Sequence, residues 1–98
     1  MDLELNGKTA LVTGGSKGIG KAVARTLARE GVRVAICSRD ANALSATAKE
    51  IGAGAKGEVI TIPADLSRAD QVQRVAEDTV GRFGRLDILV NNAGAIRG

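Results

Sequence analysis

Residues 8–20 read Lys-Thr-Ala-Leu-Val-Thr-Gly-Gly-Ser-Lys-Gly-Ile-Gly, and this stretch decides the fold. Residues 8–13 hold three consecutive apolar side chains, which is typical of a parallel strand covered on both faces. A glycine-rich turn follows, and from Gly18 to Glu30 apolar residues recur at helical spacing until Gly31 provides a stop. The stretch therefore predicts a strand, a tight turn and a helix in direct succession.

The same alternation of short apolar runs and longer helical patterns continues along the chain. Further strands are predicted at residues 32–38, 58–63 and 86–90. One further helix is predicted at residues 41–51, and another opens with Ser67–Asp70 and ends at Phe83. Right-handed crossovers favour the strand order 3-2-1-4. We therefore expect the α/β class, with a partial Rossmann-like, doubly wound parallel sheet of four strands and three helices.

Local signals refine this arrangement. Asp40 is a candidate N-cap of the second helix, Ser67–Asp70 has the spacing of a capping box, and Gly84 is a stop signal for the third helix. The strand order places the first two helices on one face and the third on the other. One side of strands one and four should then lack cover, and strand four should be a bare edge. We expect the chain to be capable of self-association through that edge and face.

Composition excludes several classes of function. The 98 residues contain no His, Tyr or Trp, so no imidazole or phenol is available as acid, base or metal ligand. The net charge is +3, but Phe83 is the only aromatic residue and Lys and Arg form no block, which argues against a nucleic-acid partner. The single Cys37 cannot form an intrachain disulfide, and we expect it to be a small apolar residue in a strand. Residues 1–5 are acidic and no long apolar run follows, so we expect no membrane association and a cytoplasmic location.

Glycines mark the junction of the first predicted strand and the first predicted helix, where a phosphate-binding turn is expected. Gly14, Gly18 and Gly20 allow the backbone to approach a pyrophosphate closely, and the free N–H groups and positive dipole of the helix N-terminus stabilise it. The spacing is neither GxGxxG nor that of a P-loop. Seven basic and four acidic residues in the first forty positions agree with a small anionic ligand.

The end of the second predicted strand distinguishes the two nicotinamide dinucleotides. An acid there binds the 2′-hydroxyl of NAD, whereas a base accepts the 2′-phosphate of NADP. The sequence has Ser38-Arg39 at this position, and Lys17 adds a second positive charge. We therefore expect NADP(H) to be favoured over NAD(H), with Asp40 either taking the ribose role or capping the helix. The basic stripe on the first helix is expected to be solvated surface: Lys21, Arg25 and Arg29.

Polar residues also follow the third and fourth predicted strands. Asp65 could accept a hydrogen bond from an adenine amino group, or it could cap the next helix. Asn91-Asn92-Ala93-Gly94 follows the fourth strand. Together with Thr13-Gly14-x-x-x-Gly18-x-Gly20, these segments resemble the short-chain dehydrogenase/reductase family, in particular its bacterial 3-oxoacyl-[acyl-carrier-protein] reductase-type members. The resemblance runs over all 98 residues.

The resemblance implies a role for each matching residue, and every role concerns a dinucleotide cofactor. It implies phosphate contacts from Ser16, Lys17 and Ile19, and contacts to the adenosine ribose phosphate from Ser38 and Arg39. It implies adenine contacts from Asp65 and Leu66, and ribose contacts from Asn92, Ala93 and Gly94. Asn91 would steady the fourth strand.

The family's catalytic Tyr-x-x-x-Lys pair has no counterpart in the sequence, which contains no tyrosine. In the family that Tyr delivers a proton while the nicotinamide delivers hydride. We therefore expect residues 1–98 to be the truncated N-terminal dinucleotide-binding part of a single Rossmann domain, without catalytic residues or a metal. The parent would be an NADP(H)-dependent oxidoreductase acting on a carbonyl or alcohol. The alternatives are a non-catalytic nucleotide-binding or interaction module and an inert fragment.

Overall fold

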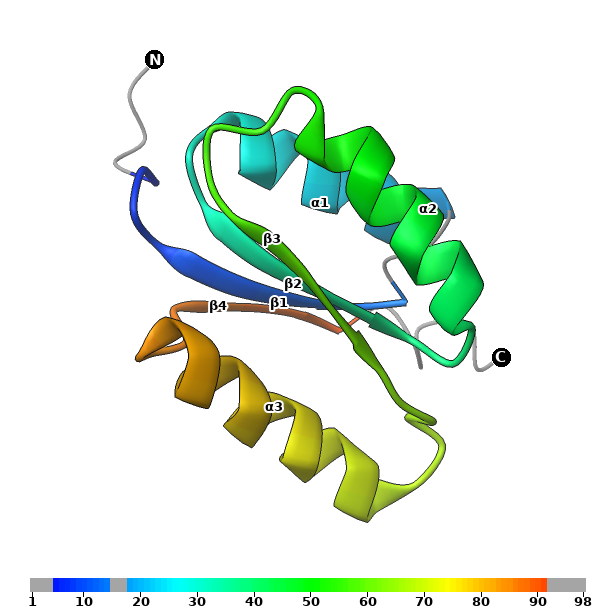
Figure 1. Ribbon diagram of the computed structural model, residues 1–98. Coiled ribbons are helices and arrows are strands. Elements are labelled where there is room, and N and C mark those ends of the chain that lie inside the picture. The colour runs from blue at the N-terminus through cyan, green and yellow to red at the C-terminus, as the bar shows by residue number, and fades with distance from the viewer. Residues whose placement is uncertain (1–4, 15–17, 92–98) are drawn as a thin grey trace.

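The computed structural model describes residues 5–14 and 18–91 (Figure 1). Four strands alternate with three helices along the chain. The strands are β1 (Thr9–Thr13), β2 (Arg33–Ser38), β3 (Val59–Pro63) and β4 (Ile88–Asn91). The helices are α1 (Gly18–Arg29), α2 (Ala41–Gly52) and α3 (Ala69–Phe83). Each element lies where the apolar pattern predicts it, and its ends agree with the predicted ones to within two residues.

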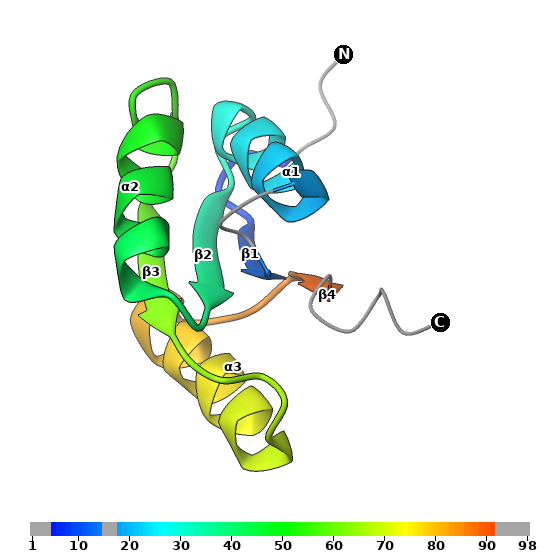
Figure 2. The same cartoon turned by 90° about the vertical axis from the view of Figure 1, so that its right-hand side faces the viewer.

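All four strands pair in parallel in the order β3-β2-β1-β4, which confirms the predicted topology. Helices α1 and α2 cover one face of the sheet and α3 covers the other (Figures 1 and 2). In register, Thr9 of β1 lies beside Arg33 of β2, and Thr13 lies beside both Cys37 and Asn91. The ends of neighbouring strands therefore meet at two common ends of the sheet: an amino end, where the strands begin, and a carboxyl end.

Two apolar cores, one on each face, hold the layers together. Beneath α1 and α2 lie strand residues such as Val34 and Ile36, packed against the alanines of α1 and against Leu44 and Ile51 of α2. Beneath α3 the core consists of Leu11, Ala35, Cys37, Ile62, Ala64, Val75 and Phe83. Consecutive residues of β2 thus enter opposite cores, which is the alternation that a strand imposes. The apolar run of β2 is explained by this burial on both faces.

The expectation that strands one and four are open on one face was wrong for the first of them. Every residue of β1 is buried. Leu11, on the face toward α3, is covered because it shares a core with Phe83, and Leu86 packs against the same core. β4 is the more open strand: it lies at the edge of the sheet, and its Leu89 is 59% exposed.

The helix ends confirm two of the three predicted signals. Asp40 is the N-cap of α2, since its side chain accepts a hydrogen bond from the Ala43 amide at 3.1 Å. Gly84 ends α3 with a φ of 89°, a left-handed conformation that glycine adopts without strain. The capping interpretation of Asp40 is therefore confirmed.

The predicted capping box at the start of α3 was wrong. Arg68 occupies the N-cap position and its side chain makes no capping bond. The Ser67 hydroxyl donates instead to Asp65 Oδ1 at 2.7 Å, and Arg68 pairs with Asp70 at 3.3 Å. In a capping box the hydroxyl oxygen would accept from an amide of the first helical turn, but here α3 begins one residue later, with Arg68 as its N-cap.

The basic stripe on α1 is more than solvated surface. Lys21 Nζ lies 2.9 Å from Glu50 Oε1, and Arg25 pairs with the other oxygen of the same carboxylate. Hydrogen bonding from Lys21 and the two nearby positive charges lower the pKa of Glu50. These contacts join α1 to α2 on the exterior, where ion pairs contribute little to stability.

Candidate functional site

The candidate site lies at the carboxyl end of the sheet. Gly14 follows β1, Ser38 ends β2 and Asp65 follows β3, so parallel pairing brings them to one end. Two backbone bonds hold them there: the Gly14 amide donates to the Cys37 carbonyl at 2.7 Å, and the Ala64 amide donates to the Ser38 carbonyl at 2.9 Å. Ligands of open α/β sheets bind outside this end of the strands.

The glycine turn shows why its residues are glycines. Gly14 has a φ of 68° and Gly18, which begins α1, has a φ of 64°. A side chain at Gly18 would meet no atom within 4 Å, so the backbone conformation, and not a clash, requires glycine there. Gly20 is buried, whereas Ile19 is 73% exposed. The predicted contacts of Ser16 and Lys17 lie outside the described residues.

Ser38 and Arg39 lie together at the end of β2. Among residues 5–14 and 18–91, Ser38 Oγ is the sole buried side-chain nitrogen or oxygen that lacks a hydrogen-bond partner. Arg39 is exposed. A buried hydroxyl without a partner costs about 1–3 kcal/mol, and nearly all buried polar groups in proteins avoid that cost. An acceptor or donor supplied by a ligand, with Arg39 beside it, would remove the cost.

Asp65 stabilises the turn that leads from β3 into α3. Its Oδ1 accepts hydrogen bonds from the Ser67 amide at 3.0 Å and the Ser67 hydroxyl at 2.7 Å. These two bonds lower the pKa of Asp65, with smaller contributions from the charges of Arg39 and Arg68. Of the two interpretations, helix capping in the strict sense is excluded because Arg68 holds the N-cap position. Leu66 is half-buried against the α3 core.

Asn91 lies at the end of β4, beside β1. The Thr13 hydroxyl donates to Asn91 Oδ1 at 3.0 Å, a contact that agrees with a steadying role for Asn91. Asn92, Ala93 and Gly94 lie outside the described residues.

Cys37 is buried in β2 as an apolar core residue, as predicted. Burial raises the pKa of its thiol to about 11, an effect that the charge of Arg74 partly offsets. The thiol therefore stays protonated and is not a nucleophile at neutral pH. Within the described ranges, no cluster of three metal-ligating side chains is found, and no helix is long and apolar enough to cross a membrane.

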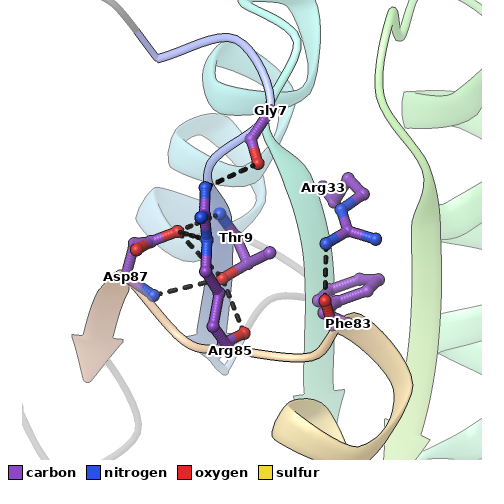
Figure 3. A network of polar contacts seen from close by, with 6 residues as sticks. All are labelled: Gly7, Thr9, Arg33, Phe83, Arg85 and Asp87. Atoms are coloured by element: carbon purple, nitrogen blue, oxygen red, sulfur yellow. Dashed lines mark hydrogen bonds and ion pairs between the residues drawn. The ribbon is translucent and has the colours of Figure 1, made fainter.

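A second group of polar side chains, which we did not predict, lies at the amino end of the sheet (Figure 3). Asp87 Oδ2 accepts from the Thr9 amide at 2.9 Å and from Arg85 Nε at 3.0 Å, and Arg85 also donates to the Gly7 carbonyl. Hydrogen bonds from Thr9 and Arg85 lower the pKa of Asp87. Thr9 and Asp87 are separated by 78 residues in the sequence, so no local pattern pointed to this contact.

Arg33 supports the same end from β2. Its guanidinium lies 4.9 Å from the centre of the Phe83 ring and donates to the Phe83 carbonyl at 2.6 Å. The last turn of α3 is thereby tied to the first residue of β2 (Figure 3).

A parallel α/β sheet in the order β3-β2-β1-β4, with a glycine turn opening its first helix, defines the doubly wound class of α/β proteins. The family model for short chain dehydrogenase matches residues 8–98. The chain therefore belongs to the short-chain dehydrogenase/reductase family.

Known relatives agree in sequence and in structure. The rhamnolipid-biosynthesis 3-oxoacyl-[acyl-carrier-protein] reductase of Pseudomonas aeruginosa is 50% identical over 90 residues, which are 92% of this chain and 34% of that protein. L-sorbose reductase from Gluconobacter frateurii, solved with NADPH and L-sorbose, superimposes with a TM-score of 0.90 at 36% identity, over 96% of this chain and 36% of that one. A metagenomic short-chain oxidoreductase solved with NADP has a TM-score of 0.83 at 44% identity, over 91% and 40% of the two chains.

The chain spans about a third of the length of the curated relatives it matches: 34% of the Pseudomonas reductase and 38% of the 3-oxoacyl-[acyl-carrier-protein] reductase from Synechocystis. The similarity therefore covers only about a third of each of those proteins.

Proposed function

We propose that this chain is the NADP(H)-binding part of an oxidoreductase that transfers hydride between a nicotinamide cofactor and a carbonyl or alcohol substrate. The observation that carries the proposal is the pair at the end of β2: a buried Ser38 hydroxyl without a partner, next to the exposed guanidinium of Arg39. A 2′-phosphate offers acceptors to both groups at once. The complexes of similar proteins with NADPH and NADP support the same cofactor.

The chain's own residues would bind and orient the cofactor. The turn from Gly14 to Gly20 would take the pyrophosphate, because its positive-φ glycines keep side chains away and α1 begins there. We propose the remaining contacts as the resemblance implies them: Ser16, Lys17 and Ile19 at the phosphates, Asp65 and Leu66 at the adenine, and Asn92, Ala93 and Gly94 at a ribose. The bound nicotinamide would supply hydride.

Proton delivery needs a group that this sequence does not hold. It contains no tyrosine and no histidine, and the family's Tyr-x-x-x-Lys pair would have to come from polypeptide other than these 98 residues. We therefore propose that the chain binds cofactor and does not reduce a carbonyl by itself. Turnover of a ketone by the pure 98-residue chain would contradict this.

The test is a calorimetric titration of the chain with NADPH and NADH, repeated with Arg39→Asp. NADPH should bind more tightly than NADH, and the substitution should weaken NADPH binding by about tenfold to a hundredfold, the effect of losing a charged hydrogen bond. Lys56→Asp makes the same change of charge in an exposed loop before β3 and should leave both affinities unchanged. Equal affinities for both dinucleotides in all three proteins would remove the 2′-phosphate argument.

We also propose that the chain can self-associate through the open side of β4 and α3. Leu89 is 59% exposed on the edge strand, and Val80, which is 42% exposed, lines a hollow on α3 together with Ala76, Glu77 and Gly81. Sedimentation velocity should detect a dimer that Leu89→Lys abolishes, because a lysine on an edge strand opposes pairing. A monomer at all concentrations would reject this proposal.

A further inference from the structure

The two oxygens of the Asp65 carboxylate are bonded differently. Oδ1 accepts from the Ser67 amide at 3.0 Å and from the Ser67 hydroxyl at 2.7 Å, whereas none of the described residues donates a hydrogen bond to Oδ2. Arg68, the residue after Ser67, pairs with Asp70 instead. Each carboxylate oxygen can accept about two hydrogen bonds, so Oδ1 is filled and Oδ2 is open.

The backbone around Asp65 is anchored independently of its side chain. Before it, the Ala64 amide donates to the Ser38 carbonyl at 2.9 Å, which brings Asp65 close to the end of β2. After it, Leu66 packs against the core beneath α3. The Asp65 side chain itself is only half-buried, and its hydrogen bonds come from Ser67. Ser67 therefore sets the orientation of the carboxylate, while β2 and the α3 core set the position of the backbone.

The same contacts keep the carboxylate ionised. Hydrogen bonds from the Ser67 hydroxyl and amide lower the pKa of Asp65, and the charges of Arg39 and Arg68 lower it further. An ionised carboxylate accepts hydrogen bonds and cannot donate one. The open Oδ2 can therefore bind a ligand N–H group, and it repels a carbonyl oxygen in the same place.

We propose that Ser67 is a positioning residue for nucleobase recognition: by occupying Oδ1, it fixes the Asp65 carboxylate with Oδ2 free to accept from the exocyclic amino group of adenine. The site should then discriminate adenine from hypoxanthine, a purine with a carbonyl oxygen in place of that amino group. A site built to hydrogen-bond one group rejects an analogue that leaves its own polar atoms unpaired. The inference rests on the proposed function, in which Asp65 contacts the adenine.

The test measures a ratio of two affinities. The wild type, Ser67→Ala and Ser67→Thr are titrated with NADPH and with its hypoxanthine analogue. The wild type should bind NADPH at least about tenfold more tightly, the effect of one hydrogen bond to a charged group. In Ser67→Ala the carboxylate must be ordered when the ligand binds, which should reduce the preference to about threefold or less. Ser67→Thr keeps a hydroxyl and should retain the preference of the wild type.

A merely structural role of Ser67 would give a different result. A general loss of structure in Ser67→Ala would weaken the binding of both ligands equally, and an unchanged ratio would overturn the proposal. Ser45→Ala makes the same substitution at an exposed position of α2 and should leave both affinities unchanged.

A second variant covers the case in which Ser67→Ala does not fold. Asp65→Asn keeps an oxygen that can accept from Ser67 and replaces the other oxygen by an N–H₂ donor. The preference for adenine should then be abolished or reversed. An equal preference in Asp65→Asn and in the wild type would reject the proposal.

Titration of the carboxyl group gives a readout that needs no cofactor. The pKa of Asp65, followed by ¹³C nuclear magnetic resonance in the free chain, should rise in Ser67→Ala and stay low in Ser67→Thr, because the hydroxyl bond is the largest cause of its lowering. Asp87, whose pKa is lowered by bonds from Thr9 and Arg85, should titrate alike in all three proteins. An unchanged pKa of Asp65 in Ser67→Ala would overturn the proposal. If the wild type binds both dinucleotides equally, this inference fails and the proposed function stands; if it binds neither, the proposed function fails and this inference fails with it.

Discussion

The two ends of one sheet differ in how their polar groups are bonded. At the amino end, the buried Thr9 uses both its amide and its hydroxyl, and Asp87 and Arg33 make short contacts with neighbouring backbone. At the carboxyl end, the buried Ser38 hydroxyl has no partner and Arg39 is exposed. β1 and β2 contribute to both ends, so the difference does not arise from separate elements.

The difference separates stability from binding within a small domain. Bonds of Thr9, Asp87 and Arg33 at the amino end hold α3 and β4 against the sheet. At the carboxyl end, one buried hydroxyl, Ser38 Oγ, has no partner among the described residues. An unsatisfied group persists where the rest of the structure supplies enough stability. Substitutions at the amino end should therefore change mainly the free energy of unfolding, and substitutions at the carboxyl end mainly the affinity for cofactor.

The largest effect is expected from Phe83→Ala at the amino end. Phe83 is 5% exposed, fills the core beneath α3 and lies under the Arg33 guanidinium. Its loss should lower the free energy of unfolding by about 3–5 kcal/mol, the usual cost of a buried phenylalanine, as measured by urea denaturation.

The control for this prediction lies on the same helix. Val72 is 45% exposed, and Val72→Ala should change the stability by no more than about 0.5 kcal/mol. If Phe83→Ala does not fold, Phe83→Leu can replace it, because leucine keeps an apolar side chain. Phe83→Leu should lower the free energy of unfolding by less than Phe83→Ala. Equal stabilities of the Phe83 and Val72 variants would show that α3 is not anchored at the amino end.

Local patterns were sufficient to predict the order and type of every element. The run before Gly14 and the helical spacing after Gly18 depend on neighbouring residues only, and so do the cap at Asp40 and the stop at Gly84. Right-handed crossovers then limited the topology. The two errors have different causes. The Ser67 hydroxyl donates to a close neighbour in the sequence, Asp65, whereas β1 is covered by residues of the α3 core that are distant in the sequence.

The location of the candidate site, like the order of the elements, was predictable from the sequence, but the contacts of its side chains were not. Parallel strands bring their ends together, so Gly14, Ser38 and Asp65 could be assigned to one end from the sequence alone. The missing partner of Ser38 Oγ depends on the packing around one atom, which no sequence pattern reports. The Thr9–Asp87 contact joins residues 78 apart, and its only local signal is an aspartate directly before a strand.

A second prediction concerns Ser38→Ala, which should change stability and binding in opposite directions. Removing a buried hydroxyl that has no partner relieves its desolvation cost, so the free energy of unfolding should stay level or rise by up to about 1 kcal/mol. NADPH binding should weaken about fivefold, because one hydrogen bond of about 1 kcal/mol is lost. Thermal unfolding and calorimetry measure the two quantities.

Thr79→Val provides the matched case of a hydroxyl that is already bonded. Thr79 is fully buried and its Oγ1 donates to the Val75 carbonyl at 2.8 Å. Its removal should lower the stability by about 0.5–1.5 kcal/mol and leave NADPH affinity unchanged. If Ser38→Ala behaves like Thr79→Val, the Ser38 hydroxyl is not reserved for a ligand.

The smallest effect is expected from acid titration of the amino end. The pKa of Asp87 is lowered in the folded chain, chiefly by the hydrogen bond from the Thr9 amide. A lowered folded-state pKa means that the stabilisation is present above the unfolded-state pKa, about 3.9, and is lost as the pH falls through the folded-state value. Tm should therefore decline below about pH 4 more steeply in the wild type than in Asp87→Asn, which keeps an acceptor but cannot titrate. If Tm falls equally steeply with acid in the two proteins, the Asp87 charge contributes nothing to the amino end. Asp65→Asn and Glu50→Gln, which remove the other two carboxylates of lowered pKa, would then be expected to make the decline less steep.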